Sequence, residues 1–312
     1  AYQRPDGRMN DTFEACVTAT FGRHLLVRAA SGKELQARPF GRGLTVVCGD
    51  NVRCRADAHH DEVHVVELLP RGTALYRSNA RGVTEPVVAN LSQLLVVLAP
   101  VPVPDLFVVD RYLAAAASGA IGGTLIVNKM ELGIDAELRE QLEVFGAAGY
   151  RWVPCSVRAN DGIDALLEIC AGQVAALVGQ SGVGKSSLVD RLIPDAGVEV
   201  GELVRDEEGR HTTTASRLFD LPLGGHLIDS PGVRDFAPAV DRLDRRSLGF
   251  IEVERLAPEC RFSDCRHMRE PGCAVRDATE GGALNPRRYE SYRRLRRLYE
   301  ELTAARRPER RR

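Results

Sequence analysis

One glycine-rich stretch has the residue types and the spacing to bind a polyphosphate. Residues 179–187 read GQSGVGKSS, which fits the pattern G-x-x-x-x-G-K-[ST], between an apolar run at 174–178 and the helical sequence LVDRLI. Glycine permits backbone conformations in which successive N–H groups turn toward a phosphate at a helix N-terminus. In this pattern the lysine meets the outer phosphates and the first serine offers its hydroxyl to magnesium. We expect nucleotide contacts from the whole loop, namely Gly179, Gln180, Ser181, Gly182, Val183, Gly184, Lys185, Ser186 and Ser187.

Two later segments have side chains suited to magnesium and to a terminal phosphate. The sequence GRHTTT follows a charged stretch, and one of its three threonine hydroxyls, taken as Thr213, is expected to complete the magnesium shell with Ser186. A β-strand that begins with threonines is an equally good interpretation of these residues alone. Farther on, LID ends a predicted strand and runs into SPG. There we expect Asp229 to hold magnesium through water and the amide of Gly232 to meet the terminal phosphate.

A third segment, NKME at 128–131, could read a base. The Glu131 carboxylate can accept hydrogen bonds from two ring-edge donors of guanine, while Asn128 reads the neighbouring edge and the stem of Lys129 packs over the base. We include Met130 in this loop, and Ser156 from the end of the next strand, although a loop serine is usually only a turn residue. The usual last residue of such a loop is aspartate. The longer glutamate weakens base discrimination if its geometry is poorly matched.

A cysteine-rich segment near the C-terminus has the spacing of a zinc site. Three thiols and one imidazole fall within 14 residues, a Cys3His set suited to tetrahedral zinc. Four protein ligands leave no open position, which favours a structural zinc ion over a catalytic one. The predicted ligands are Cys260, Cys265, His267 and Cys273, and the five other cysteines are expected to be buried reduced thiols.

Alternating strands and helices must position the phosphate and base motifs. Apolar runs at 94–99, 124–127, 151–155 and 174–178 alternate with helical patterns at 106–117, 138–147 and 162–170. This order predicts an α/β fold with a parallel sheet that is covered on both faces and that binds ligands at the carboxyl ends of its strands.

Other elements are predicted on either side of this sheet. Five short β-branched runs between 12 and 69 predict an OB-type β-barrel, a fold that either binds nucleic acid or serves as a spacer. Residues 70–89 are predicted to be a linker, and the histidines and acids at 57–62 a polar hairpin tip rather than a metal site. A helix is expected from Asn285 onward, with apolar residues on one face. Its other face would present Arg287, Arg293, Arg294 and Arg297 to RNA phosphates.

Composition sets the broad class. The chain has 312 residues, 44% of them hydrophobic, which is enough for two or three folded domains. The net charge is -1, yet the last 26 residues carry 11 arginines against four glutamates, so this end is the candidate contact for a polyanion. Because no apolar run approaches the roughly 18 residues that span a bilayer, we expect a cytoplasmic protein with no membrane partner.

Together these motifs are the set found in GTPases, but the base-reading motif precedes the phosphate motifs. In this rotated order, with a barrel in front and a Cys/His cluster behind, nearly the whole chain resembles the circularly permuted ribosome small subunit-dependent GTPase family (RsgA). The resemblance implies an N-terminal OB-type barrel (1–70), a circularly permuted P-loop GTPase domain (71–237) and a mostly helical, zinc-binding C-terminal module (238–312). It also implies hydrolysis of GTP to GDP with Mg²⁺ and one structural Zn²⁺. The activity would be stimulated by the small ribosomal subunit during late maturation, with a monomer contacting the subunit and its rRNA.

The residues for hydrolysis are the least defined part of the sequence. Val233 follows Gly232, so no glutamine stands there to orient the attacking water, and intrinsic turnover is expected to be slow. His211 matches the family's switch loop and is a candidate to position water, or it is a solvated loop histidine. Lys185 would neutralise charge on the transferring phosphoryl group. Two alternatives are an ATP-dependent P-loop enzyme, if Glu131 does not select guanine, and a non-catalytic rRNA-binding scaffold.

Overall fold

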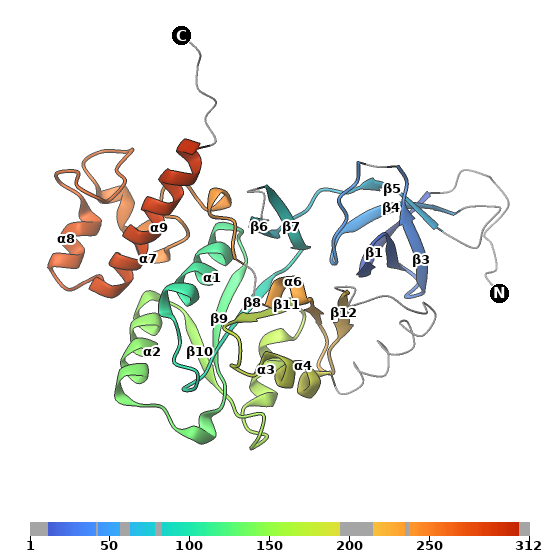
Figure 1. The fold of residues 1–312 in the computed structure, drawn as a ribbon, viewed down its shortest axis with the longest axis horizontal. Helices are drawn as coiled ribbons and strands as arrows, with labels where there is room; N and C mark the ends of the chain where they lie inside the picture. Colours follow the sequence, from blue (N-terminus) through green and yellow to red (C-terminus); the bar gives the residue numbers. More distant parts are fainter. Residues whose placement is uncertain are drawn as a thin grey trace, which may run out of the picture.

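The computed structural model describes residues 12–41, 43–56, 63–78, 83–193, 215–234 and 237–305. Three parts follow one another along the chain. A β-barrel (blue in Figure 1) leads into a central α/β part (green to yellow), and a helical part (orange to red) lies on the opposite side of the centre from the barrel.

The barrel is a closed five-stranded sheet. Its strand order is β1-β2-β3-β5-β4, and β4 returns to pair with β1, which closes the sheet. All pairings are antiparallel except β3 with β5. Val17, Val27, Val52 and Val65 fill its interior, as alternation along half-buried strands requires. The predicted OB-type barrel is confirmed, with strands β1 (Thr12–Phe21), β2 (His24–Ala29), β3 (Glu34–Pro39), β4 (Asn51–Ala56) and β5 (Val63–Leu68).

The segment predicted as a linker contains a β-hairpin. Strands β6 (Ala74–Ser78) and β7 (Thr84–Ala89) pair antiparallel as a separate two-stranded sheet. Leu75 and Val88 face each other in the ladder and are buried in the central core. The prediction was wrong here because polar and turn-forming residues dominate the composition, while only these few apolar side chains anchor the strands.

The central sheet is parallel and carries helices on both faces. Its order is β10-β9-β8-β11-β13, followed by the antiparallel strand β12. Side chains of α1 and α2 belong to one core and those of α3 and α4 to another, so each helix pair covers one face, as Figure 1 shows. The predicted alternation is confirmed, with β8 (Gln93–Leu98), α1 (Leu106–Ser118), β9 (Gly122–Val127), α2 (Ala136–Ala148), β10 (Arg151–Pro154), α3 (Ile163–Cys170), β11 (Val174–Gly179), α4 (Lys185–Leu192), β12 (Ser216–Asp220) and β13 (His226–Asp229).

Strand β12 also joins the central sheet to the barrel. Ala19 and Thr20 of β1 pair antiparallel with Arg217 and Ser216 of β12. The result is one continuous 11-stranded sheet that runs from the central part into the barrel.

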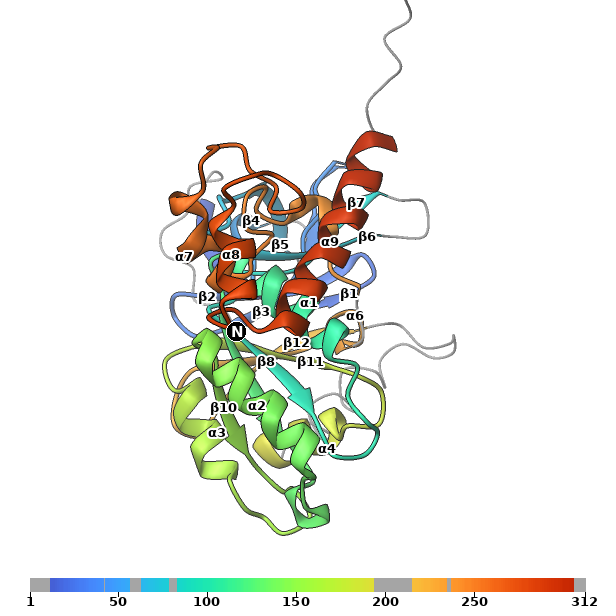
Figure 2. The same cartoon turned by 90° about the vertical axis from the view of Figure 1, so that its left-hand side faces the viewer.

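The C-terminal part packs on α1 through one long helix. Helix α9 (Pro286–Ala305) begins after Asn285, whose Oδ1 accepts hydrogen bonds from the backbone N–H groups of Arg287 and Arg288, so the predicted N-cap is confirmed. The helix lies beside α1 (Figures 1 and 2). The shorter elements of this part are η2 (Val240–Arg242), α7 (Ile251–Leu256), η3 (Ala257–Glu259) and α8 (Ala274–Glu280), while α6 (Pro231–Arg234) packs against β11 and β7 of the central part.

One arginine of α9 was assigned to the wrong environment. Arg287 donates to Asp110 of α1 at 2.7 Å and lies over the ring of Phe145, so it is a docking residue rather than part of an open RNA-facing surface. Arg294 and Arg297 are exposed, as predicted, whereas Arg293 is half-buried and donates to Glu290 at 3.0 Å.

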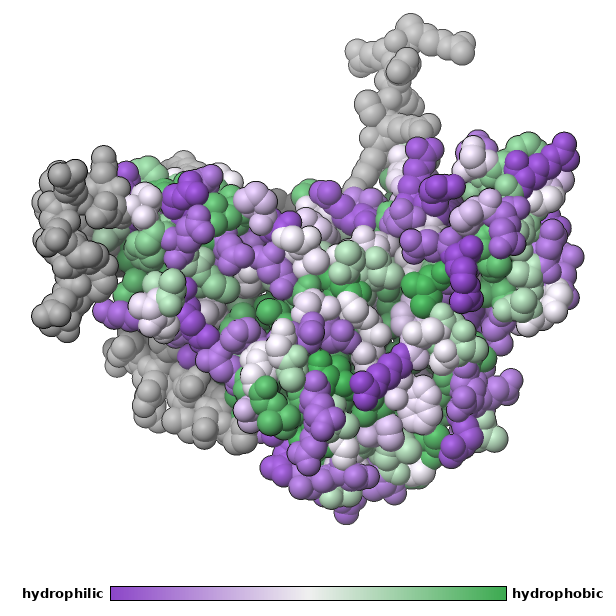
Figure 3. Space-filling model, turned by 180° about the vertical axis from the view of Figure 1, so that it is seen from behind, coloured by the Kyte–Doolittle hydropathy of each residue, from purple (hydrophilic) through white to green (hydrophobic). Residues whose placement is uncertain are grey.

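The surface mixes polar and apolar side chains. Figure 3 shows hydrophilic atoms interspersed with hydrophobic ones across the face seen from behind, including the C-terminal part at the right of that view. Among the described residues, no helix combines the length and the apolar character that crossing a bilayer requires.

Candidate functional site

The phosphate loop joins strand β11 to helix α4 by way of glycines in left-handed conformations. Gly182 and Gly184 have φ of 83° and 97°, and Gly179 has φ of 149°. A Cβ on Gly179 would lie 2.2 Å from the carbonyl oxygen of Val97, and one on Gly184 would lie 2.3 Å from Nδ2 of Asn128. Side chains are therefore excluded at both ends of the loop by close neighbours as well as by backbone conformation.

Lys185 opens helix α4 and turns its side chain back into the loop. Its Nζ donates to the carbonyl oxygens of Gly179 at 2.7 Å and Gln180 at 2.9 Å, and the residue is buried. The ammonium group therefore lies inside the turn of the loop, at the N-terminal end of a helix where the helix dipole also favours an anion.

The base-reading loop is bonded directly to the phosphate loop. Asn128, only 2% exposed, donates from Nδ2 to the carbonyl oxygen of Val183 at 2.9 Å. Lys129 donates from Nζ to the carbonyl oxygens of Gly182 at 2.6 Å and Val101 at 2.9 Å. These bonds hold the two loops in one rigid arrangement at the carboxyl ends of β9 and β11, where a parallel sheet binds its ligands.

Glu131 and Ser156 also meet, as neighbours at the same edge of the sheet. The Ser156 hydroxyl donates to Oε2 of Glu131 at 2.5 Å and accepts from the backbone N–H of Ala159 at 2.9 Å. The hydrogen bond from Ser156 lowers the pKa of the exposed Glu131 carboxyl, so this group is an anionic acceptor at neutral pH. Met130, which precedes Glu131, packs against the core.

Ser186 and Asp229, the described members of the predicted magnesium set, are brought together by an arginine. The Arg234 guanidinium donates to both carboxylate oxygens of Asp229, at 2.7 and 2.6 Å, and to the hydroxyl of Ser186 at 2.8 Å. One planar cation thus reaches both side chains at once. A hydroxyl and a carboxylate are oxygen donors of the kind magnesium prefers, so this pair fits the ion.

The remaining predicted residues for hydrolysis are only partly described. His211 and the three threonines Thr212, Thr213 and Thr214 lie outside the described residues. Gly232 is the second residue of α6 and lies three residues after Asp229. Val233 is 1% exposed and belongs to the central core, so the residue after Gly232 is a packing residue and not one that could orient water.

The four predicted zinc ligands converge. One ligand atom from each of Cys260, Cys265, His267 and Cys273 lies within 4.8 Å of the others. Nδ1 of His267 is 3.5 Å from the sulfurs of both Cys260 and Cys273. Burial lowers the pKa of His267 to about 4, which keeps the imidazole in the neutral form that binds metal. The donor set and its convergence fit a tetrahedral zinc ion.

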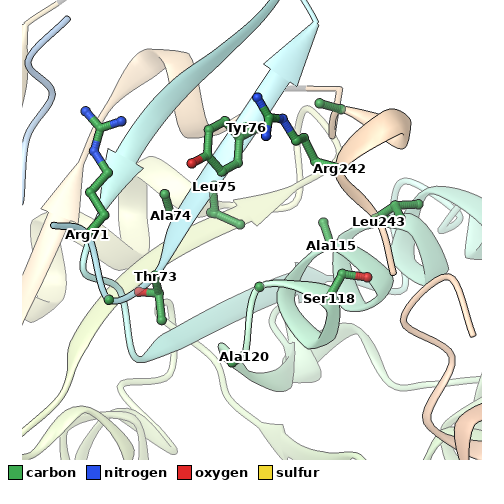
Figure 4. A pocket seen from close by; sticks show the side chains of 13 residues that line it. Arg71, Thr73, Ala74, Leu75, Tyr76, Ala115, Ser118, Ala120, Arg242 and Leu243 are labelled. Carbon is green, nitrogen blue, oxygen red and sulfur yellow. The ribbon is translucent and has the colours of Figure 1, made fainter. Parts of the chain in front are cut away.

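A hollow of about 380 Å³ lies away from these sites, between strand β6, the end of α1 and η2 (Figure 4). Its two arginines are engaged with protein groups. Arg71 is forked onto the buried Asp50, and Arg242 lies 4.9 Å above the ring of Tyr76. The hollow therefore marks a junction between parts of the chain, and we assign it no ligand.

Two arginines were missed in the sequence, one at the nucleotide site and one where α9 packs on α1. Arg234 lies two positions after the last residue of SPG. A positively charged side chain so close to a predicted magnesium site could have indicated that it contacts the magnesium ligands. Arg288 is 1% exposed and bonds Asp110 and Glu252. Its spacing of four from Tyr292 and seven from Leu295 places it on the apolar face of α9, which the helical period alone could have indicated.

Comparisons with known proteins agree with this geometry. The family model described as RsgA GTPase matches residues 68–238. The chain is 44% identical over 288 residues to the small ribosomal subunit biogenesis GTPase RsgA of Chromohalobacter salexigens, covering 89% of this chain and 84% of that protein. It is 42% identical over 286 residues to the protein of the same name from Pseudomonas putida, covering 89% and 83%.

Solved structures show the same fold. The circularly permuted GTPase YloQ has a TM-score of 0.71 at 23% identity over 98% of this chain and 100% of that one. YjeQ from Thermotoga maritima has a TM-score of 0.70 at 24% identity over 92% and 98%. The rotated motif order therefore folds as the permuted arrangement, and the chain belongs to the RsgA GTPase family.

Proposed function

We propose that this chain hydrolyses GTP and acts in biogenesis of the small ribosomal subunit, the role stated in the names of its relatives. The observation that carries the GTP assignment is the direct bonding of the base-reading loop to the phosphate loop through Asn128 and Lys129. A base held by Glu131 and Ser156 would thereby be held at a set distance from phosphates cradled by residues 179–187. The ATP-dependent and scaffold alternatives have no comparable support.

In this proposal each part of the site has one task. Lys185 and the loop amides bind the phosphates, and Gly232 contacts the terminal phosphate through its amide. Ser186, Thr213 and, through water, Asp229 would hold magnesium, and the bound ion would supply neutralisation of charge on the phosphate oxygens. His211 orients the attacking water, since the buried Val233 has no side-chain donor or acceptor to do so.

The parts on either side of the central domain are assigned to binding of rRNA, and the zinc ion to support of the cysteine loop. The barrel (1–70) and the C-terminal module (238–312) contact rRNA on either side of the permuted GTPase domain (71–237). Exposed Arg294 and Arg297 contribute phosphate contacts, and one structural zinc ion holds the cysteine loop. We expect a cytoplasmic monomer.

Turnover measured with and without small ribosomal subunits tests this function. GTP hydrolysis should be slow without subunits and rise clearly with them. Excess unlabelled GTP, but not excess ATP, should compete with labelled GTP for the site. Equal, negligible rates in both conditions would contradict the GTPase assignment, and equal competition by ATP would favour the ATP-dependent alternative. In the same assay, full stimulated turnover by His211→Ala would remove this histidine from the mechanism.

A further inference from the structure

Arg234 contacts both described side chains of the predicted magnesium site while belonging to neither the phosphate loop nor the base loop. We propose that its guanidinium competes with Mg²⁺ for Asp229 and Ser186, so that magnesium–nucleotide binding must displace Arg234. This inference rests on the proposed function. Arg234 is thus a positioning residue, whose location depends on whether the cation site is filled.

The geometry of the contact makes the two cations mutually exclusive. Nε and Nη2 of Arg234 fork onto the two oxygens of Asp229, at 2.7 and 2.6 Å, and Nη1 reaches Ser186 at 2.8 Å. A fork of this kind occupies lone pairs on both carboxylate oxygens. Magnesium requires near-octahedral oxygen ligands at about 2.0–2.1 Å and keeps several waters. A planar guanidinium in the same space would exclude those waters and repel the ion.

Arg234 lies in the same short turn as Gly232, the predicted contact of the terminal phosphate. It ends α6, of which Gly232 is the second residue. The backbone N–H of Arg234 donates to Ser230 at 3.1 Å, and Ser230 accepts from Ser216 of β12 at 2.7 Å. One short turn therefore carries the phosphate-sensing amide and the competing cation, and it is bonded to the strand that reaches the barrel. Filling the cation site would free the Arg234 side chain at the end of this turn.

Magnesium titration of nucleotide binding tests the competition directly. A fluorescent GDP analogue is held at fixed concentration with the full chain, and the magnesium concentration at half-saturation is measured. Arg234→Ala should lower that midpoint about tenfold, the size expected when a charge-assisted fork no longer competes. Arg234→Lys should lie between, since a lysine keeps the charge but cannot form the fork.

A control variant tests whether the change in the magnesium midpoint is specific to Arg234 or follows from the loss of an arginine–carboxylate pair elsewhere. Arg28 donates to Asp220 at 2.8 Å, and its side chain is 26% exposed, against 25% for Arg234. Arg28→Ala should leave the magnesium midpoint unchanged. If Arg234→Ala does not fold, Arg234→Lys alone decides.

Two results distinguish the failure of this inference from failure of the proposed function. A wild-type chain that binds GDP with magnesium dependence, together with variants whose midpoint is unchanged or higher, would overturn the competition only. A higher midpoint would mean that Arg234 supports the loaded site. A wild-type chain that binds no guanine nucleotide at any magnesium concentration would remove the proposed function, and this inference with it.

Discussion

Lys185 is the residue on which phosphate binding most depends. Its ammonium group is buried inside the loop, where it donates to Gly179 and Gln180. An ammonium group that donates to carbonyl oxygens keeps its positive charge for an anion, and the helix N-terminus beside it favours the same ligand.

Replacing this lysine should abolish efficient turnover. Lys185→Ala is expected to lower GTP turnover about 100-fold or more, because charge on the transferring phosphoryl group is left uncompensated. Single-turnover hydrolysis is the measurement, with Lys33→Ala, from the turn between β2 and β3, as the control. Unchanged hydrolysis in Lys185→Ala would place the phosphates elsewhere.

The pairing of Ser156 with Glu131 makes a prediction about base choice. Ser156→Ala removes the hydrogen bond at 2.5 Å that orients the carboxylate, so preference for GTP over ATP should fall about tenfold. Competition of GTP and ATP for a fluorescent guanine nucleotide gives the ratio. Ala159→Gly leaves both side chains in place and should keep the preference. An unchanged ratio in Ser156→Ala would show that Glu131 is oriented without this bond.

At the scale of elements, helix α9 is joined to helix α1 by a buried cluster of charges. Arg288 donates to Asp110 of α1 at 2.5 Å and to Glu252 of α7 at 2.6 and 2.8 Å, and all three residues are buried. Burial alone would lower the pKa of Arg288, but the two carboxylates outweigh it and raise that pKa. Arg288 therefore stays charged, and its bonds to Asp110 and Glu252 fix how the C-terminal part sits on the central part.

Removing Arg288 should lower the free energy of unfolding substantially. Arg288→Ala leaves the buried Glu252 without this cation and leaves Asp110 with Arg287 alone, and the expected loss is about 3–5 kcal/mol in the free energy of unfolding. Urea unfolding of the full chain measures it. The exposed Arg297→Ala, on the same helix, should change the value by less than about 0.5 kcal/mol. A similar small change in both would mean that the cluster contributes little.

At the scale of the whole molecule, two connections link the central part to its neighbours. Strand β12 pairs with β1 of the barrel, and α9 packs on α1. The zinc site lies beyond the second connection, and α9 supports it, since Tyr289 and Tyr292 donate to the carbonyl oxygens of His267 and Arg266. Loss of zinc should therefore disturb the C-terminal part first.

Zinc removal tests whether the parts fold separately. Chelation, or Cys273→Ser, should release zinc and expose the 260–273 loop to protease, because the ion is what would link the four ligands of this loop to one another. GDP binding by the same sample should persist. Cys170→Ser, a buried cysteine of α3, is the control and should keep zinc. Simultaneous loss of GDP binding and of the C-terminal part would contradict separate folding.

Local patterns in the sequence determined much of this protein. The glycine spacing of residues 179–187, the four zinc ligands and the alternating strands and helices each depend on neighbours within about a dozen residues, and the structure has the predicted elements. The family resemblance followed from the order of those motifs. Local periodicity and turn chemistry are properties that a sequence carries on its own.

Only the tertiary structure decided which distant residues meet. Asn128 with Val183, Arg234 with Ser186, and Arg288 with Asp110 are separated by 55, 48 and 178 residues. No spacing rule predicts such pairs, because they arise where two sheet edges or two helices pack. The hairpin at 74–89 was missed for the same reason, since two apolar side chains were enough to anchor it once the central core was there to receive them.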